Sequence, residues 1–527
     1  MNFPNLSLEL ISPIFLGVIA ISLIILLILN FKDKEILKEL KEIRKDILVV
    51  IFLVFLLGFY LRAFYMPHRF IADDLAYIKT AEGISKTGRA QICGYSGYDT
   101  LSCDKMNKIF VYPFLLAIIF YLFGISTDLA FNLNILLGSL SIFLIFLVSY
   151  FLFNKNERIG IYSALLFSLF PFFIRNSITA ETEASSIFFI LFALLCFLLY
   201  FRIDNFKMQM LALISLTFAV WTRFENIMLL PLFILFLILE QNFKFKIKDF
   251  KFLVPWLICG IFFISIFIQN VENYKFNVFA AVQYDKISEV FRYDELKANI
   301  VKYGENILNG KLHPPILNLF IIIGILHFWG YSRSCFLMLN WFFCFFILYM
   351  SMFETVIDLY LLPPYLGLIF FGGYGTSKIL DRIKEIKYSH AFSLSLVIVT
   401  SLSFYPHIQN IYLEKPGRLI LETKIPELVE KEISKDCYIV TKFPTILMAT
   451  TDLKAIMTEH IIQNPEIITE ILNKKICLLY FEDMYSLFVF REENEKIHDR
   501  YNLTSIFGYK SDDRKAEYKF YKIKSKI

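Results

Sequence analysis

The sequence is dominated by apolar runs of about 20 residues, which is the length that an α-helix needs to cross the hydrocarbon core of a membrane. Two shorter runs, 208–222 and 226–240, are separated by Arg223 and Glu225, and this interruption predicts the tip of a helical hairpin. Together the runs predict twelve membrane spans. The ten longer runs are 11–30, 47–66, 129–153, 158–176, 184–202, 252–270, 314–332, 335–353, 359–377 and 389–406.

The composition excludes a soluble protein of this length. Apolar residues make up 57% of the 527 residues and charged residues 19%, whereas soluble domains average about 45–50% apolar and about 25% charged. The chain is therefore expected to be an all-α polytopic membrane protein. The first run, Ile11 to Leu29, lacks a preceding basic region, so we expect a retained helix and not a cleaved signal peptide.

Lysine and arginine residues concentrate in the connections on one side of these spans. The basic connections are 32–46, 154–158, 202–207, 241–251 and 378–388. Because positive charge favours the cytoplasmic side, the opposite side is expected to be the extracytoplasmic face of the cell membrane. This assignment requires that the run Ile109–Phe123, which is 15 residues long and contains Pro113, does not span. We expect it to be an interfacial helix on the outer surface.

This topology predicts three regions. Residues 1–46 form an extra N-terminal transmembrane helix with a cytoplasmic linker. Residues 47–409 form the transmembrane domain with a long external loop at 67–108, and residues 410–527 form a small extracytoplasmic α/β domain. In this tail, segments typical of helices are followed by segments typical of strands. The pairs are Pro426–Ser434 with Cys437–Val440, and Ile467–Lys474 with Ile476–Phe481.

Two adjacent carboxylates, Asp73 and Asp74, follow the span 47–66 on the outer side. The next segment, Leu75 to Lys86, is amphipathic and ends at Gly88, so Asp73 is suited to cap this helix. A carboxylate at the membrane boundary is also suited to act as a general base on a hydroxyl group. Capping and catalysis are compatible, because one aspartate can cap while the other acts.

Further charged residues lie on the same outer side. Glu181 and Glu183 are expected in an outer turn, either solvated or forming a second acidic wall of an external site, since burial in the bilayer is costly. Arg223 at the hairpin tip either pairs with Glu225 or meets lipid phosphate, or it clamps a substrate phosphate. Lys105 and Lys108 add positive charge before the interfacial helix, as surface residues or as phosphate ligands.

The cysteines and short motifs add little chemistry. Cys93 and Cys103 flank a segment of the external loop, and we expect them to form a disulfide there. Asn502-Leu-Thr504 matches the N-glycosylation sequon. The sequence has no CxxC pair, glycine-rich phosphate loop, zinc HExxH motif or nucleic-acid-binding motif, so neither a thiolate metal site nor a nucleic-acid partner is expected.

In this order and on this side, the motifs resemble those of polytopic glycosyltransferases of the GT-C fold that use lipid-phosphate sugars. Protein O-mannosyltransferases and the aminoarabinose transferases of lipid A are examples. The resemblance covers most of residues 47–500. It is carried by Asp73-Asp74, Tyr112-Pro113, Phe123-Gly124, Glu181/Glu183 and Tyr360-Leu-Leu-Pro-Pro-Tyr365.

The resemblance implies transfer of a monosaccharide from a polyprenyl (dolichyl-type) phosphate donor to a hydroxyl on a protein, glycan or lipid. The anomeric centre would be inverted, with Asp73 or Asp74 as the base. Glu181 or Glu183 would orient hydroxyl groups, and Tyr77 and Tyr112 would stack on sugar rings or simply pack. No cofactor is required by resemblance, although paired carboxylates are able to recruit a divalent metal.

Two departures from the family pattern bear on this interpretation. Leu359-Tyr360 stands where many relatives have an Arg-Tyr pair, so phosphate binding would fall to Arg223, Lys105 or Lys108. The WWDYG motif of oligosaccharyltransferases is absent, which disfavours transfer of whole glycans.

The alternative function is a flippase for lipid-linked sugars or another membrane transporter. Transport sites usually lie near the bilayer midplane. Here the central parts of the long spans carry almost no ionisable residues, and the acids gather at one face. This distribution favours chemistry at the interface.

Overall fold

The computed structural model of the chain divides into two compact units, and each is considered by itself. The helical unit comprises residues 1–68, 107–115 and 128–412, and the mixed unit comprises residues 69–106, 116–127 and 413–527. The residues that the structure describes are 8–65, 74–95, 101–105, 111–203, 205–240, 254–263, 293–308, 313–327, 341, 361–383, 389–413, 425, 427–429, 431–434, 436–441, 453–483, 491–510 and 517–524.

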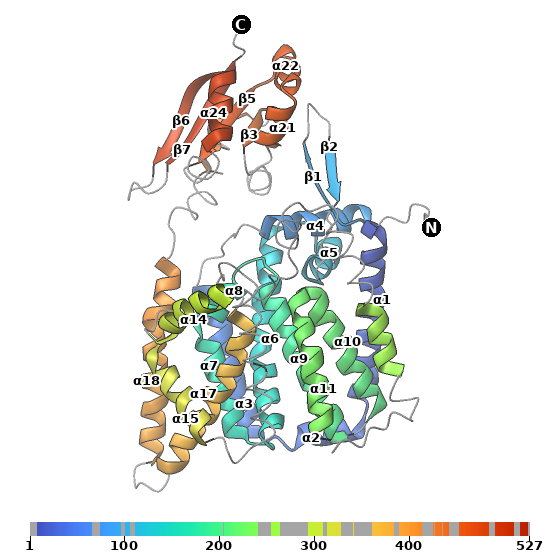
Figure 1. The fold of residues 1–527 in the computed structure, drawn as a ribbon, viewed down its shortest axis with the longest axis vertical. Coiled ribbons are helices and arrows are strands. Elements are labelled where there is room, and N and C mark those ends of the chain that lie inside the picture. The colour runs from blue at the N-terminus through green and yellow to red at the C-terminus, as the bar shows by residue number, and fades with distance from the viewer. Residues whose placement is uncertain are drawn as a thin grey trace. The chain divides into compact units, whose positions relative to one another are not determined.

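The helical unit consists of apolar helices, many of them side by side, with shorter helices between them (Figure 1). Its helices are α1 (Leu8–Phe31), α2 (Lys34–Lys41), α3 (Lys45–Tyr60), the π-helix η1 (Leu61–Tyr65), α6 (Thr127–Leu152), α7 (Glu157–Leu169), α8 (Pro171–Ser177), α9 (Glu183–Ile203), α10 (Phe206–Thr222), the 3₁₀-helix η2 (Phe224–Met228), α11 (Leu229–Glu240), α14 (Tyr293–Leu308), α15 (Pro315–His327), α17 (Leu362–Ile383) and α18 (Ser389–Leu413). The helix α5 (Val111–Phe123) contributes residues to both units.

Within the described residues, four helices are long and apolar enough to cross a membrane, and five if the bent pair α7–α8 is one span. The four windows are Pro13–Asn30, Lys45–Phe64, Thr127–Leu152 and Glu183–Ile203. The chain is therefore a multi-pass membrane protein. The predicted total of twelve is not tested in full, because the run 335–353 lies, apart from Trp341, outside the described residues.

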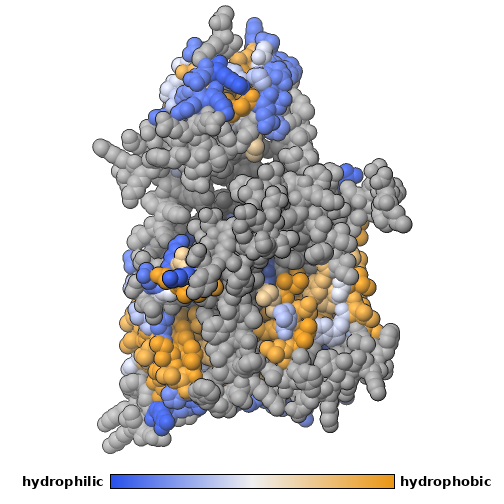
Figure 2. Space-filling model, in the orientation of Figure 1, coloured by the Kyte–Doolittle hydropathy of each residue, from blue (hydrophilic) through white to orange (hydrophobic). Residues whose placement is uncertain are grey.

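Large apolar side chains are exposed along the helices that would face lipid. On α1, Ile14, Val18, Ile21 and Ile25 recur every three or four residues and are each more than half exposed. Such a spacing places side chains on one face of a helix. Figure 2 likewise shows hydrophobic residues over the sides of the helical unit. Lipid tails are suited to cover this surface.

The predicted span 158–176 is one helix in the sequence analysis but two in the structure. The chain breaks at Phe170, which has extended backbone angles, and α8 begins at Pro171 at an angle of 62° to α7. Proline removes a backbone donor and disfavours helical geometry at the residue before it, which explains the break. The predicted hairpin break is confirmed, because α10 ends at Thr222 and Arg223 is extended.

One end of the helical unit is held by ion pairs of the predicted cytoplasmic connections. Lys155, in the turn after α6, lies 3.0 Å from Glu39 and 2.5 Å from Glu42 at the end of α2. Asn134 lies near the other end of α6, 18 residues before Leu152. At 1.5 Å per residue these ends are about 27 Å apart, close to the thickness of the hydrocarbon core.

The mixed unit contains a seven-stranded sheet with helices. Its elements are α4 (Asp74–Thr87), β1 (Gln91–Tyr95), β2 (Leu101–Lys105), β3 (Tyr438–Thr441), β4 (Lys454–Met457), α21 (Thr458–Gln463), α22 (Glu466–Asn473), β5 (Leu478–Asp483), α24 (Arg491–Arg500), β6 (Asn502–Lys510) and β7 (Glu517–Lys524). The strand order is β2-β1-β4-β3-β5-β7-β6. The pairs β1–β4, β4–β3 and β3–β5 in the middle of the sheet are parallel. The remaining pairs are antiparallel.

The α/β pattern expected of the tail is confirmed at three of its four elements. The strands β3 and β5 and the helix α22 lie within one or two residues of the predicted bounds, whereas the helix predicted at Pro426–Ser434 lies only partly among the described residues. Successive residues of β3 enter different cores, Ile439 on one face and Val440 on the other. The sheet is therefore covered on both faces, as a parallel sheet requires.

Candidate active site

The structure describes only part of the predicted site. Asp74, Glu181, Glu183, Arg223 and Tyr112 are described with their side chains. Lys105 and the cysteine pair 93 and 103 are described only in their backbones, and Asp73 and Lys108 lie outside the described residues. Residues 178–182 together with Glu183 are called the acidic loop below. This loop belongs to the helical unit, whereas the aspartate pair belongs to the mixed unit.

Asp74 is the first residue of α4 and is fully buried. The helix ends where the sequence predicts. Gly88 has φ +70° and its N–H donates to the Ile84 carbonyl over 2.9 Å, a conformation that glycine adopts without strain. A start at residue 74 agrees with Asp73 as the N-cap, and the role of Asp73 stays a prediction.

The middle of α4 is stabilised by an acidic residue between two lysines. Glu82 lies 2.9 Å from Lys79 and 2.7 Å from Lys86. Burial alone would raise the pKa of Glu82, but the hydrogen bonds from Lys79 and Lys86 outweigh it and the pKa is lowered. A carboxylate with a lowered folded-state pKa stabilises the fold above its unfolded pKa, and this contribution is lost as the pH falls.

We therefore expect the amides of α4 to be less protected from hydrogen exchange at about pH 3 than at about pH 6, by roughly two- to fivefold beyond the intrinsic effect. In Glu82→Gln the difference should vanish. Measuring exchange by mass spectrometry at both pH values checks this. An equal pH-linked loss in Glu82→Gln would mean that another carboxylate is responsible.

The acidic loop connects α8 to α9 and is fixed by a residue of α6. Asn134 donates from Nδ2 to the carbonyl of Thr179 over 2.7 Å and to the carbonyl of Glu181 over 2.6 Å. Because both partners are carbonyl oxygens, the amide orientation of Asn134 is unambiguous. Glu181 and Glu183 are each only 4% exposed. The loop is thus a buried acidic turn, which differs from the solvated turn considered from the sequence.

Removing the Asn134 amide should displace this loop. Asn134→Ala leaves two buried carbonyls without their donor, which costs about 2–4 kcal/mol. We expect a lower Tm, together with slower turnover in the transfer reaction that the resemblance implies. Asn156→Ala is a matched control, because Asn156 caps α7 through the amides of Arg158 and Ile159 at the other end of the unit. A lower Tm with unchanged turnover in Asn134→Ala would show that the loop position does not limit the reaction.

Arg223 joins the hairpin tip to the first turn of α9. Its guanidinium is paired with the Glu183 carboxylate, and its Nη2 lies 3.7 Å from Glu225. Next to it, Asn226 donates over 2.7 Å to the hydroxyl of Ser186. The pairing with Glu225 that the sequence suggested is present. The three charges sum to −1, so a phosphate clamp at Arg223, which stays a prediction, would have to compete with two carboxylates.

Tyr112 is fully buried at the start of α5. Its hydroxyl donates over 3.0 Å to the Ala130 carbonyl of α6. This contact matches the packing role that the sequence left open. The helix α5 has 13 residues, about 20 Å in length, which is too short for a membrane span of about 30 Å.

One charged residue that the sequence analysis missed lies in the helical unit. Arg62, on η1, is fully buried and touches α3, α7 and α8. A signal was present, because Arg62 is an ionisable residue inside the predicted span 47–66, and such residues are rare and functional in membrane helices. Among the described residues, no group of three or more His, Cys, Asp or Glu side chains is placed to hold a metal ion.

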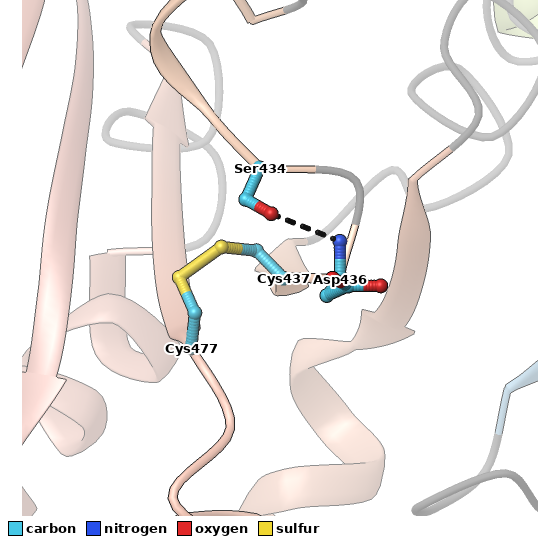
Figure 3. Close-up of a disulfide and its surroundings, with 4 residues drawn as sticks. All are labelled: Ser434, Asp436, Cys437 and Cys477. Carbon is cyan, nitrogen blue, oxygen red and sulfur yellow. Dashed lines mark hydrogen bonds between the residues drawn. A yellow bond between two sulfur atoms is a disulfide. The ribbon is translucent and has the colours of Figure 1, made fainter.

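The mixed unit contains a disulfide that the sequence analysis also missed. Cys437 and Cys477 are bonded, with Cα atoms 4.5 Å apart (Figure 3). They precede the parallel neighbours β3 and β5, and two parallel strands begin at the same edge of a sheet. In β1 and β2, Cys93 and Cys103 face each other in the antiparallel register. This register suits a disulfide, which stays a prediction.

Comparison with known proteins gives a partial match to one of the families that the sequence motifs resemble. Residues 107–270 match the family model "Dolichyl-phosphate-mannose-protein mannosyltransferase". Among the curated proteins, none matches the sequence.

Solved structures match over almost the whole chain. ArnT of Cupriavidus metallidurans matches at 11% identity, over 90% of this chain and 97% of its own, with TM-scores of 0.60 in the apo state and 0.56 bound to undecaprenyl phosphate. The oligosaccharyltransferase AglB of Archaeoglobus fulgidus, in complex with an inhibitory peptide and a dolichol-phosphate, matches at 13% identity, over 90% of this chain and 74% of its own, with a TM-score of 0.52. The chain is thus identified as a multi-pass membrane protein of the GT-C glycosyltransferase fold, in which residues 107–270 match the mannosyltransferase family model.

Proposed function

We propose that the chain is a membrane glycosyltransferase that moves a monosaccharide from a polyprenyl phosphate to a hydroxyl group at the extracytoplasmic face. The observation that carries this proposal is the buried acidic loop of a GT-C fold, with Glu181 and Glu183 fixed by Asn134 and Arg223. The matched structures of ArnT and AglB hold undecaprenyl phosphate and dolichol-phosphate. A lipid-phosphate donor for this chain follows by analogy.

The sidedness of the reaction is supported by two features. Lys155 and the acidic loop lie toward opposite ends of α6, which agrees with basic connections in the cytoplasm and acids outside. The Cys437–Cys477 disulfide suits an oxidising compartment, which supports a C-terminal unit outside the cytoplasm.

In the proposed step, Asp73 or Asp74 takes the proton of the acceptor hydroxyl. The hydroxyl oxygen forms a bond to the anomeric carbon, the bond from that carbon to the phosphate oxygen breaks, and the lipid phosphate leaves as an anion. Direct displacement inverts the anomeric centre. Glu181 or Glu183 would accept hydrogen bonds from sugar or acceptor hydroxyls, and the Glu183 Oε2 atom has no hydrogen-bond partner among the described residues.

The departing phosphate needs positive charge and no general acid. Lys105, Lys108 and Arg223 are our candidates for that charge. The proposal includes no cofactor, and adding or chelating divalent cations in the assay tests that expectation.

The test is an assay of purified protein in detergent with a panel of polyprenyl-phosphate monosaccharides and a hydroxyl acceptor. We expect wild-type protein to release free polyprenyl phosphate from one donor, with product of inverted configuration. If no donor is consumed and the reconstituted protein instead moves a lipid-linked sugar across vesicles, the transporter alternative is favoured.

A further inference from the structure

Arg62 is a buried cation whose contacts with the described part of the chain are all uncharged. Its Nη1 donates to the carbonyl of Gly58 over 2.9 Å and to that of Ser168 over 3.3 Å, and its Nε donates to the hydroxyl of Ser177 over 3.3 Å. The guanidinium carbon lies 5.8 Å from the centre of the Phe167 ring. No carboxylate among the described residues pairs with it. A buried charge of this kind is costly, so a role is expected.

The surrounding helices leave room for this guanidinium at two glycines. A Cβ atom at Gly58 would lie 2.3 Å from Ile142 Cδ1 and 3.1 Å from Arg62 Nη1. A Cβ atom at Gly138 would lie 2.2 Å from the Ser177 hydroxyl, the group that accepts from Arg62. The lack of a side chain at Gly58 and Gly138 therefore leaves the space in which the guanidinium and the Ser177 hydroxyl meet.

The contacts of Arg62 lie on both sides of the bend between α7 and α8. Ser168 is in the last turn of α7, where carbonyls lack helical partners and the helix dipole is negative. Ser177 is the last residue of α8, four residues before Glu181. One guanidinium thus bonds to both arms of the 62° bend, and the direction of α8 sets where the acidic loop begins.

Arg62 also lies on the segment that continues toward the aspartate pair. It belongs to η1, a π-helix, and precedes Asp73 by 11 residues. Irregular π-turns inside α-helices are frequent at functional sites.

We propose that Arg62 is a positioning residue, which holds the α7–α8 bend and thereby places the acidic loop for sugar transfer. The inference rests on the proposed function. An alternative use of the same cation is direct binding of the donor phosphate through Nη2, which has no hydrogen-bond partner among the described residues. The two uses differ in what they do to donor affinity.

The test compares Arg62→Lys and Arg62→Met with matched variants of Arg202. Arg202 also donates to a carbonyl, that of Phe151 over 2.9 Å, and lies 5.4 Å from the centre of its ring. For Arg62→Met we expect kcat per folded enzyme to fall by about 10²-fold, the typical effect of a displacement of about 1 Å, with unchanged Kd for polyprenyl phosphate. Arg62→Lys should recover part of the loss, and the Arg202 variants should retain activity.

Hydrogen exchange of residues 178–182 provides a readout that does not depend on turnover. We expect faster exchange there in Arg62→Met and unchanged exchange in Arg202→Met. If wild-type protein transfers no sugar but this difference appears, the proposed function fails and the positioning role stands. Unchanged exchange and kcat in folded Arg62→Met would overturn the inference, and so would a loss that appears only as a raised Kd for polyprenyl phosphate.

If the Arg62→Met protein does not accumulate, Ser177→Ala is the substitute variant. It keeps Arg62 and removes the hydroxyl that accepts the hydrogen bond from the Arg62 Nε. It should produce a smaller effect of the same kind, with lower kcat, faster loop exchange and unchanged Kd. A Ser177→Ala protein with wild-type values of kcat and loop exchange would contradict the proposed link between Arg62 and α8.

Discussion

Asp73→Asn and Asp74→Asn are each expected to leave folding intact, and at least one of them should lower kcat for sugar transfer by about 10²- to 10⁴-fold, the usual contribution of a general base. Asn and Asp are nearly equal in size and both are good helix caps. The start of α4 at residue 74 is therefore preserved in either variant. What is lost is the ability to accept the proton of the acceptor hydroxyl.

The matched control for this pair is Asp46→Asn. Asp46 is likewise in the first turn of a helix, α3, but it is exposed and lies 3.0 Å from Arg44 in a predicted cytoplasmic connection. We expect this variant to retain full turnover. Initial rates and Tm should be measured on all three variants with the donor that wild-type protein consumes. Full activity in both Asp73→Asn and Asp74→Asn would show that the base is assigned wrongly.

Much of the helical unit could be predicted, because its helices are defined by apolar length and by charged interruptions. The ends of α1, α6 and α9 lie close to the predicted spans, and the break at Arg223 is where a polar pair interrupts two apolar runs. The bend at Phe170 was missed although Pro171 indicates it, because an apolar run continues through the bend. Hydropathy reports burial in lipid and does not report helix direction.

The contacts that build the site were harder to predict, because they join residues far apart in the chain. Asn134 and Glu181 are separated by 47 residues, and Arg62 and Ser177 by 115. A single sequence gives the chemistry of such residues but not their partners. Likewise, strands in the tail were expected, but a contribution of the external loop to their sheet was not. The strands β1 and β2 of that loop extend the sheet, because β1 pairs with β4 at Tyr95 and Ile456.

Removing the Cys437–Cys477 disulfide is expected to destabilise the mixed unit strongly. The bond joins residues 40 positions apart, and closing a loop of that size in the unfolded chain is worth about 4 kcal/mol. For a unit of this size, the Cys437→Ser/Cys477→Ser double variant should unfold roughly 10 °C below wild-type protein. Proteolysis of the full chain across a temperature series, read out on C-terminal fragments, measures this.

The same bond tests the topology, because disulfides persist outside the cytoplasm and are rare within it. Peptides linking Cys437 to Cys477 should be found by mass spectrometry of unreduced protein alkylated in whole cells, and a reporter fused after Ile527 should lie outside the cytoplasm. Reductant should lower the unfolding temperature of wild-type protein by more than that of the double variant, which keeps the predicted bond between Cys93 and Cys103. If both cysteines are alkylated in cells and the reporter is cytoplasmic, the predicted orientation is reversed. The acidic loop, near the opposite end of α6 from Lys155, would then face the cytoplasm, and extracytoplasmic transfer could not stand.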